Sequence, residues 1–140
     1  MRKPKIRDSI KEDIPKKNNG NRNRTAGHNY ERQLAKEFRE ILGDLDCRTS
    51  RQSSRILDDC KVDLDCYFLN IQAKNVRSNI NYSELYKDIK GALTTTLPRR
   101  SDFPIAIFHK KQSKEMVIMN KDDFYKLALA YKRELDGHQT

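Results

Sequence analysis

The chain has 140 residues, a length that fits one domain and excludes two large ones. Its 29 Lys and Arg residues outnumber 20 Asp and Glu residues, which gives a formal net charge of +9, and only 36% of the residues are hydrophobic. We expect neither a membrane span nor a secretory signal, because no segment is apolar enough and the basic N-terminus lacks an apolar core. A basic protein of this size most often binds a polyanion, usually nucleic acid.

The basic charge is concentrated in residues 1–28, which contain nine Lys or Arg and only three Asp or Glu. The segment has few large apolar residues, and it includes two prolines and a run rich in Asn. Such a composition buries too little surface to offset the entropy of ordering, so we predict a disordered basic arm. The spacing of Ile6, Ile10 and Ile14 would allow one amphipathic helix on docking. The arm either contacts phosphates or is a solubilising tail without a partner.

The rest of the chain alternates between helical and strand periodicity. The patterns predict helices from about Asn29 to Leu42, from Ser83 to Leu93 and from Asp122 onward, and strands at 62–76, 104–109 and 116–119. The apolar side of the last helix consists of Phe124, Leu127, Ala128, Tyr131 and Leu135. Residues 29–135 are therefore predicted to form one small α/β domain with a sheet flanked by helices, followed by a frayed tail at 136–140.

The three cysteines, at positions 47, 60 and 66, are odd in number and form no closely spaced pair. A structural zinc site is therefore not expected. We expect reduced thiols that pack as small core residues, which is typical of a cytoplasmic protein.

The polar segment between the first helix and the central strand contains Arg48, Arg51 and Arg55 among several serines. It is predicted to be a loop or an edge strand. Arg and Ser side chains together are suited to phosphate contacts, although the same composition is also ordinary for a loop.

Glu31 lies on the apolar face of the first helix, because it precedes Leu34, Ala35 and Phe38 by three, four and seven residues. A carboxylate that points inward needs a partner, a metal ion or a cleft. Alternatively, Glu31 lies in the first turn of the helix, interacts with the helix dipole and stays solvated. The position alone does not decide between these interpretations.

Residues 62–76 are the most apolar part of the chain, and their alternation predicts a core strand whose other face presents Gln72 and Lys74. Asp63 and Gln72 are nine positions apart, and an odd separation places two side chains on opposite faces of an unbroken strand. If the two residues share a site, a turn or bulge must therefore intervene near residues 64–66.

A carboxylate, a second oxygen ligand and a nearby lysine are the groups that metal-dependent phosphodiester hydrolysis requires. Asp63 followed by Gln72-Ala73-Lys74 resembles the signature of the PD-(D/E)XK nuclease superfamily. Glu31 in the first helix and the Arg- and Ser-containing segment after it are similar to the pattern of archaeal-type Holliday junction resolvases. The resemblance covers roughly residues 27–131 and implies a restriction-endonuclease-like mixed sheet flanked by helices.

Two positions depart from the family pattern. Val62 stands where the superfamily has proline, and Gln72 stands where a second acid is expected. Gln is neutral and offers one oxygen, so it lowers the affinity for a metal unless another acid contributes. The strand around Gln72 looks like that of Mrr-type restriction nucleases, in which Gln is a familiar variant.

The resemblance implies a Mg²⁺ ion, replaceable by Mn²⁺, that is held by Asp63, Gln72, Glu31 and the carbonyl group of Ala73. It also implies that Lys74 orients the attacking water. The residues expected to contact DNA are Arg22, Arg24, Arg48, Arg51, Ser53 and Arg55. Relatives cut branched DNA as two-fold dimers, so a homodimer is expected.

Several alternatives remain open at this point. One of the neighbouring acids Asp58, Asp59 and Asp65 could replace Asp63 as the ligand, and Asp63 with Lys74 could be a plain surface ion pair. The nuclease could be of a restriction or repair type. The chain could instead be a non-catalytic nucleic-acid-binding module on the same fold, in which Gln72 is the substitution that abolishes cleavage. It could also be a basic structural or RNA-binding protein.

Overall fold

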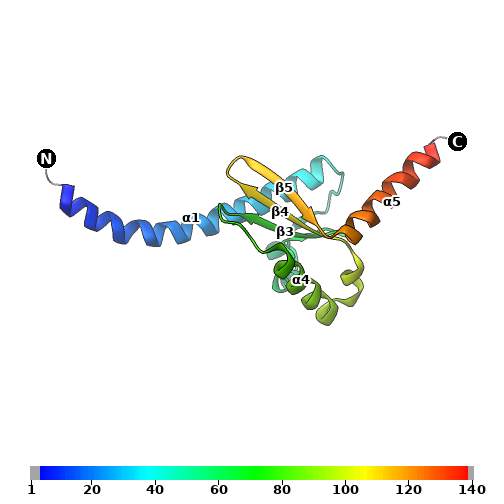
Figure 1. The fold of residues 1–140 in the computed structure, drawn as a ribbon, viewed down its shortest axis with the longest axis horizontal. Helices are drawn as coiled ribbons and strands as arrows, with labels where there is room; N and C mark the ends of the chain where they lie inside the picture. Colours follow the sequence, from blue (N-terminus) through cyan, green and yellow to red (C-terminus); the bar gives the residue numbers. More distant parts are fainter. Residues whose placement is uncertain (1–3, 139–140) are drawn as a thin grey trace.

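The protein is an α/β domain built on a five-stranded mixed sheet with flanking helices, as expected from the sequence (Figure 1). The computed structural model describes the backbone of residues 4–138 and the side chains of residues 22–138. The elements in chain order are α1 (Pro4–Glu40), β1 (Arg48–Thr49), α2 (Ser50–Ser53), α3 (Arg55–Asp59), β2 (Leu64–Asp65), β3 (Asn70–Asn75), α4 (Tyr82–Thr96), the 3-10 helix η1 (Pro98–Asp102), β4 (Ile105–Lys111), β5 (Lys114–Met119) and α5 (Lys121–His138).

The strands lie in the order β1-β2-β3-β4-β5, and only β3 and β4 are parallel. The connection between these two strands runs through α4, as a parallel pair requires. Apolar residues of β4 alternate between two cores, with Ala106 in one and Ile105 and Ile107 in the other, because successive side chains point to opposite faces of a sheet. One core includes Leu34 and Phe38 of α1, and the other includes Ile89 and Leu93 of α4.

The segment predicted as one strand over 62–76 is an antiparallel hairpin. Leu64 of β2 pairs with Ile71 of β3, and residues 66–69 connect the two strands. This register places Asp63 opposite Gln72, so an odd separation in the sequence becomes a shared face in the fold. The expected turn is thus present, but it follows Asp65 instead of lying within residues 64–66.

Two helix starts differ from the sequence expectation because Asn residues cap them. Asn81 precedes α4, and its Oδ1 atom accepts a hydrogen bond from the backbone N–H of Glu84 at 3.0 Å, so the helix begins at Tyr82 instead of Ser83. Asn120 precedes α5 and accepts from the N–H of Asp122 at 2.8 Å. α5 then continues through residues 136–138 of the expected tail, and residues 139–140 lie outside the described part of the chain.

The helix expected from Asn29 is the C-terminal part of α1, whose backbone begins at Pro4. In Figure 1 the N-terminal part of α1 extends away from the sheet, in the direction opposite to α5. The disorder of this arm in solution stays a prediction, because the side chains of residues 1–21 lie outside the described part of the chain. Among the described residues, no helix is both long and apolar enough to cross a membrane.

Candidate active site

Asp63 and Gln72 meet at the start of the β2–β3 hairpin, where both side chains are buried. The Oδ2 atom of Asp63 accepts a hydrogen bond from Gln72 Nε2 at 2.5 Å and another from the backbone N–H of Ala73 at 2.7 Å. The cross-strand register explains both contacts, since a residue and its opposite neighbour share one face of the sheet. The structure therefore brings together the two residues that the sequence motif separates by nine positions.

The carboxyl group of Asp63 is strongly perturbed. Burial raises its pKa from 3.8 to about 7, because a charged carboxylate loses its hydration there. The N–H of Ala73 and the ammonium group of Lys74 lower this pKa, whereas the negative charges of Glu31 and Asp58 raise it. Lys74 and Glu31 thus lie within electrostatic reach of Asp63, and a perturbed carboxyl group of this kind is typical of functional sites.

Glu31 reaches the site from α1. Its carboxylate is 13% exposed and forms an ion pair with Arg51 of α2, with 2.7 Å between Oε1 and Nη2. The low exposure of the Glu31 side chain and its ion pair with Arg51 contradict the alternative of an acid that stays solvated at a helix N-terminus. The inward-pointing carboxylate has a partner, and this partner is one of the arginines expected to contact DNA.

The neighbouring acids have different surroundings. Asp65 accepts a hydrogen bond from Ser53 Oγ at 2.9 Å and pairs in register with Arg48. Asp59 is exposed at the end of α3. Asp58 acts on Asp63 through its charge. Asp63 is therefore the acid that faces Gln72, and Asp58 is the nearest of the three alternatives by electrostatic effect.

The residues expected to contact DNA are not gathered equally around Asp63. Arg51 lies near the site because it forms an ion pair with Glu31. Arg48 instead donates hydrogen bonds to the carbonyl oxygens of Leu45 and Cys47 at 3.1 and 3.0 Å. Ser53 is held by Asp65, and its hydroxyl group also donates to the Thr49 carbonyl oxygen at 3.3 Å. The remaining three, all exposed, are Arg22, Arg24 and Arg55.

The oxygen atoms around Gln72 are of the kind that Mg²⁺ prefers. Gln72 Nε2 lies 2.5 Å from Asp63 Oδ2 and 3.4 Å from the carbonyl oxygen of Ala73. If the side-chain amide of Gln72 were flipped, its oxygen would face the carboxylate of Asp63 and the carbonyl oxygen of Ala73. This arrangement is favourable when a cation lies between the three oxygen atoms. The donor set therefore fits Mg²⁺ in chemical type, with Glu31 available if it releases Arg51.

The cation would depend on neutral donors to an unusual degree. In the part of the chain that the structure describes, no three His, Cys, Asp or Glu side chains are grouped so that they could hold a metal ion. The amide of Gln72 and the carbonyl group of Ala73 would have to complete a set that begins with Asp63. This dependence is the structural consequence of Gln in place of the second acid.

Arg100 of η1 holds the connection between β2 and β3 in place. Its Nη2 atom donates to the carbonyl oxygens of Cys66 and Leu69 at 2.8 and 3.1 Å, and its Nε atom donates to Asn70 Oδ1 at 3.1 Å. These bonds hold the turn that places Asp63 opposite Gln72. The contacts span about thirty residues of sequence, so no local pattern signals them.

The three cysteines are free and buried, as small core residues should be. Burial raises the pKa of the Cys47 thiol to about 12, which keeps the group protonated and unreactive.

No protein-family model matches the sequence, and no curated protein or solved structure matches it. Function is therefore inferred from the geometry and the charges of the site.

Proposed function

We propose that this protein is a Mg²⁺-dependent DNA endonuclease with a restriction-endonuclease-like fold of the PD-(D/E)XK type, acting on branched DNA such as the Holliday junction. The observation that carries this proposal is the juxtaposition of Asp63 with Gln72, next to Lys74 on the same strand and near Glu31. The order of elements from α1 through the β2–β3 hairpin to α4 and β4 agrees with the order that the sequence resemblance implies.

In this proposal each residue of the site has its own role in phosphodiester hydrolysis. Asp63, Gln72 and the Ala73 carbonyl group would hold the metal ion, which would lower the pKa of bound water and neutralise charge on the phosphate. Lys74 orients the attacking water and stabilises negative charge that develops on the phosphate oxygens. Arg51 is held near the site by Glu31 and is placed to contact a phosphate of the incoming strand.

The decisive experiment compares a labelled four-way junction with a linear duplex of the same sequence, in Mg²⁺ and in EDTA. We expect Mg²⁺-dependent, symmetric nicking of the junction. Asp63→Asn and Lys74→Ala should each lower the rate by roughly 100-fold or more, as losses of single metal- or water-positioning groups do. Asp59→Asn is the matched control, because this acid is exposed and outside the site, and it should retain full activity.

Full cleavage by either site variant would refute the assignment of the site. Asp63→Asn is suited to the test because an asparagine oxygen can still accept the hydrogen bonds from Gln72 and Ala73, so the fold is kept. Far-UV circular dichroism and the melting temperature of each variant establish that a loss of activity is not a loss of structure.

A second candidate function is structure-selective DNA binding without cleavage. The observation that favours it is the replacement of the second acid by Gln72, together with the ion pair that occupies Glu31. Tight binding of the junction without nicking in Mg²⁺, Mn²⁺ or other divalent ions would support this function and exclude the first. Gln72→Glu then becomes informative, because a restored acid should create metal-dependent cleavage in a scaffold that otherwise only binds.

A further inference from the structure

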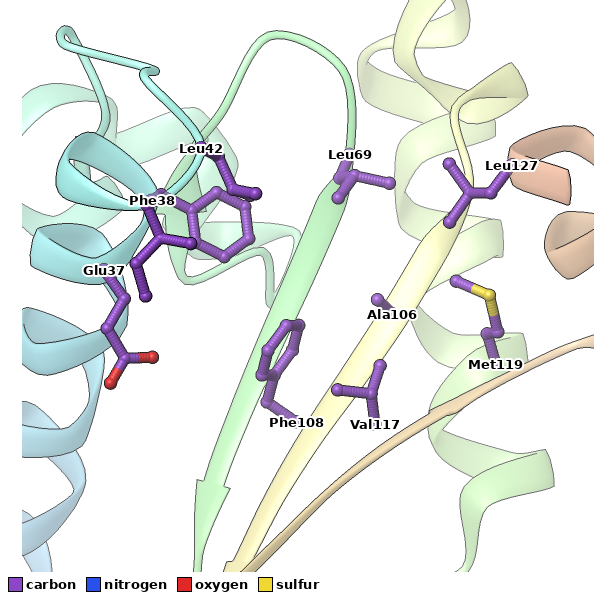
Figure 2. A pocket seen from close by; sticks show the side chains of 10 residues that line it. Glu37, Phe38, Leu42, Leu69, Ala106, Phe108, Val117, Met119 and Leu127 are labelled. Carbon is purple, nitrogen blue, oxygen red and sulfur yellow. The ribbon is translucent and has the colours of Figure 1, made fainter. Parts of the chain in front are cut away.

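An apolar groove lies on the α1 side of the sheet, between the end of α1 and the strands β4 and β5 (Figure 2). Its walls include Phe38, Leu42, Leu69, Phe108, Val117 and Leu127. Leu42 and Val117 are 55% and 52% exposed, and Ile41 at the rim is 75% exposed. Apolar surface of this extent on a soluble domain commonly marks an interaction site.

The last helix has an apolar stripe that its own domain does not cover. Phe124, Leu127, Tyr131 and Leu135 follow helical spacing and are 54%, 37%, 67% and 45% exposed. Leu127 also lines the groove, so the stripe and the groove form one continuous apolar surface. The sequence predicted an apolar side for this helix, and in a single copy of the chain most of that side is exposed.

The first turns of α5 are fixed in a direction that leads away from the sheet. The buried carboxylate of Asp123 accepts a hydrogen bond from the backbone N–H of Ile105 at 3.0 Å, and Lys126 donates to the carbonyl oxygen of Asp102 at 2.7 Å. From there α5 extends beyond the domain (Figure 1). A helix held in this way cannot turn back to place Tyr131 and Leu135 in the groove of its own chain.

We propose that two copies of the chain exchange α5, so that the stripe of each helix lies in the apolar groove of the other copy. Each chain then contributes its α5 helix to the groove of the other copy and its own groove to the α5 helix of that copy. The two contacts are identical and are related by a two-fold axis. Self-association by this route is a property of these surfaces and requires no nuclease activity.

The available area fits a stable dimer. With about half of each large side chain exposed and about 200 Å² per side chain, the seven exposed residues of the stripe and groove offer on the order of 700 Å² per copy. This is about the area that each partner contributes to an interface of standard size.

The first test measures the mass of the full-length protein in solution by light scattering. We expect twice the chain mass of 16.5 kDa. Leu135→Glu should raise the dissociation constant by roughly 100-fold or more, because a symmetric dimer contains the substitution twice. Leu129→Glu is the matched control on the same helix, since Leu129 is 47% exposed but lies off the stripe, and it should leave the dimer intact.

A second test distinguishes helix exchange from a face-to-face pairing of two α5 helices. Tyr131→Glu damages the helix and Leu42→Glu damages the groove, and each variant alone should be monomeric with an unchanged melting temperature. Mixing them should restore a heterodimer, because the intact helix of one variant fits the intact groove of the other.

A monomeric wild-type chain, dissociation by Leu129→Glu as readily as by Leu135→Glu, or failure of the mixed variants to associate would overturn the proposal.

Discussion

Asp63 is held in a state that costs stability unless a cation is present. Its carboxylate has two hydrogen-bond donors, Gln72 and Ala73, but burial still raises its pKa to about 7. Lys74 lowers the pKa without restoring it to the ordinary value. A domain that needed Asp63 only for folding would be better served by a neutral residue in this position. The stability cost of the buried Asp63 carboxylate supports its proposed role as a ligand.

Replacing Asp63 with Asn should stabilise the metal-free protein at neutral and alkaline pH. Because the folded state binds a proton more tightly than the unfolded state, stability should fall as pH rises from about 4 to about 7 and stay level above that range. The difference from the ordinary pKa of 3.8 sets an upper limit of roughly 4 kcal/mol on the gain at pH 8.

Denaturant unfolding in EDTA at a series of pH values measures this gain, which should vanish near pH 4. Asp59→Asn, at an exposed position, should show no such dependence on pH. A variant at Asp63 that is less stable than the wild type at pH 8 would show that its partners stabilise the charged carboxylate after all.

Motif spacing pointed to Asp63 and Gln72, which the fold brings into contact, and to Lys74 and Glu31, whose charges act on Asp63. It did so because an acid, an amide and a lysine in this order are uncommon together and because Glu31 interrupts an apolar face. The ion pair between Glu31 and Arg51 was not predictable, since the two residues lie twenty positions apart with no shared period.

At the scale of elements, the β2–β3 hairpin determines whether a site exists. Its connection over residues 66–69 contains neither Gly nor Pro, so the sequence shows no turn signal. The turn is stabilised instead by Arg100 of η1, which donates hydrogen bonds to the carbonyl groups of Cys66 and Leu69. Long amphipathic helices and the buried strand were predictable from periodicity, whereas strands of two residues, such as β1 and β2, have no measurable period.

Arg100→Ala should lower the free energy of unfolding by about 2–3 kcal/mol, because it leaves carbonyl groups of the hairpin and the Asn70 side chain without their donor. If the hairpin then shifts, cleavage should fall further than the loss of folded protein explains. Thermal unfolding and the junction assay, run at a temperature where the variant is folded, separate the two effects. Arg99→Ala is the control, since Arg99 is exposed beside Arg100, and equal losses in both variants would contradict this role.

At the scale of the whole molecule, charge and apolar surface lie in different parts. The N-terminal part of α1 extends from one side of the sheet and α5 from the other (Figure 1). Residues 1–28 carry nine of the 29 basic residues, whereas the exposed apolar surface lies around the groove and α5. Charge composition predicted a separate basic segment, but periodicity alone did not show that the apolar side of α5 stays exposed in a single chain.

Deleting residues 1–28 should weaken binding to DNA of any sequence and reduce its dependence on salt. Each phosphate that a basic residue neutralises contributes about 0.9 to the slope of log K against log salt concentration, so losing several of the nine basic residues should lower the slope by roughly 2–5. Fluorescence anisotropy with a labelled duplex over a salt series measures the slope.

A matched variant keeps the length of the arm but replaces its Lys and Arg residues with Gln. If the arm acts through charge, this variant should reproduce the effect of the deletion on both affinity and slope. Unchanged affinity after the deletion would make the arm a solubilising tail. The Gln variant differs from the wild type only in the charge of the arm. If the deletion lowers the affinity for DNA and the Gln variant does not, the effect therefore comes from the length or helicity of the arm.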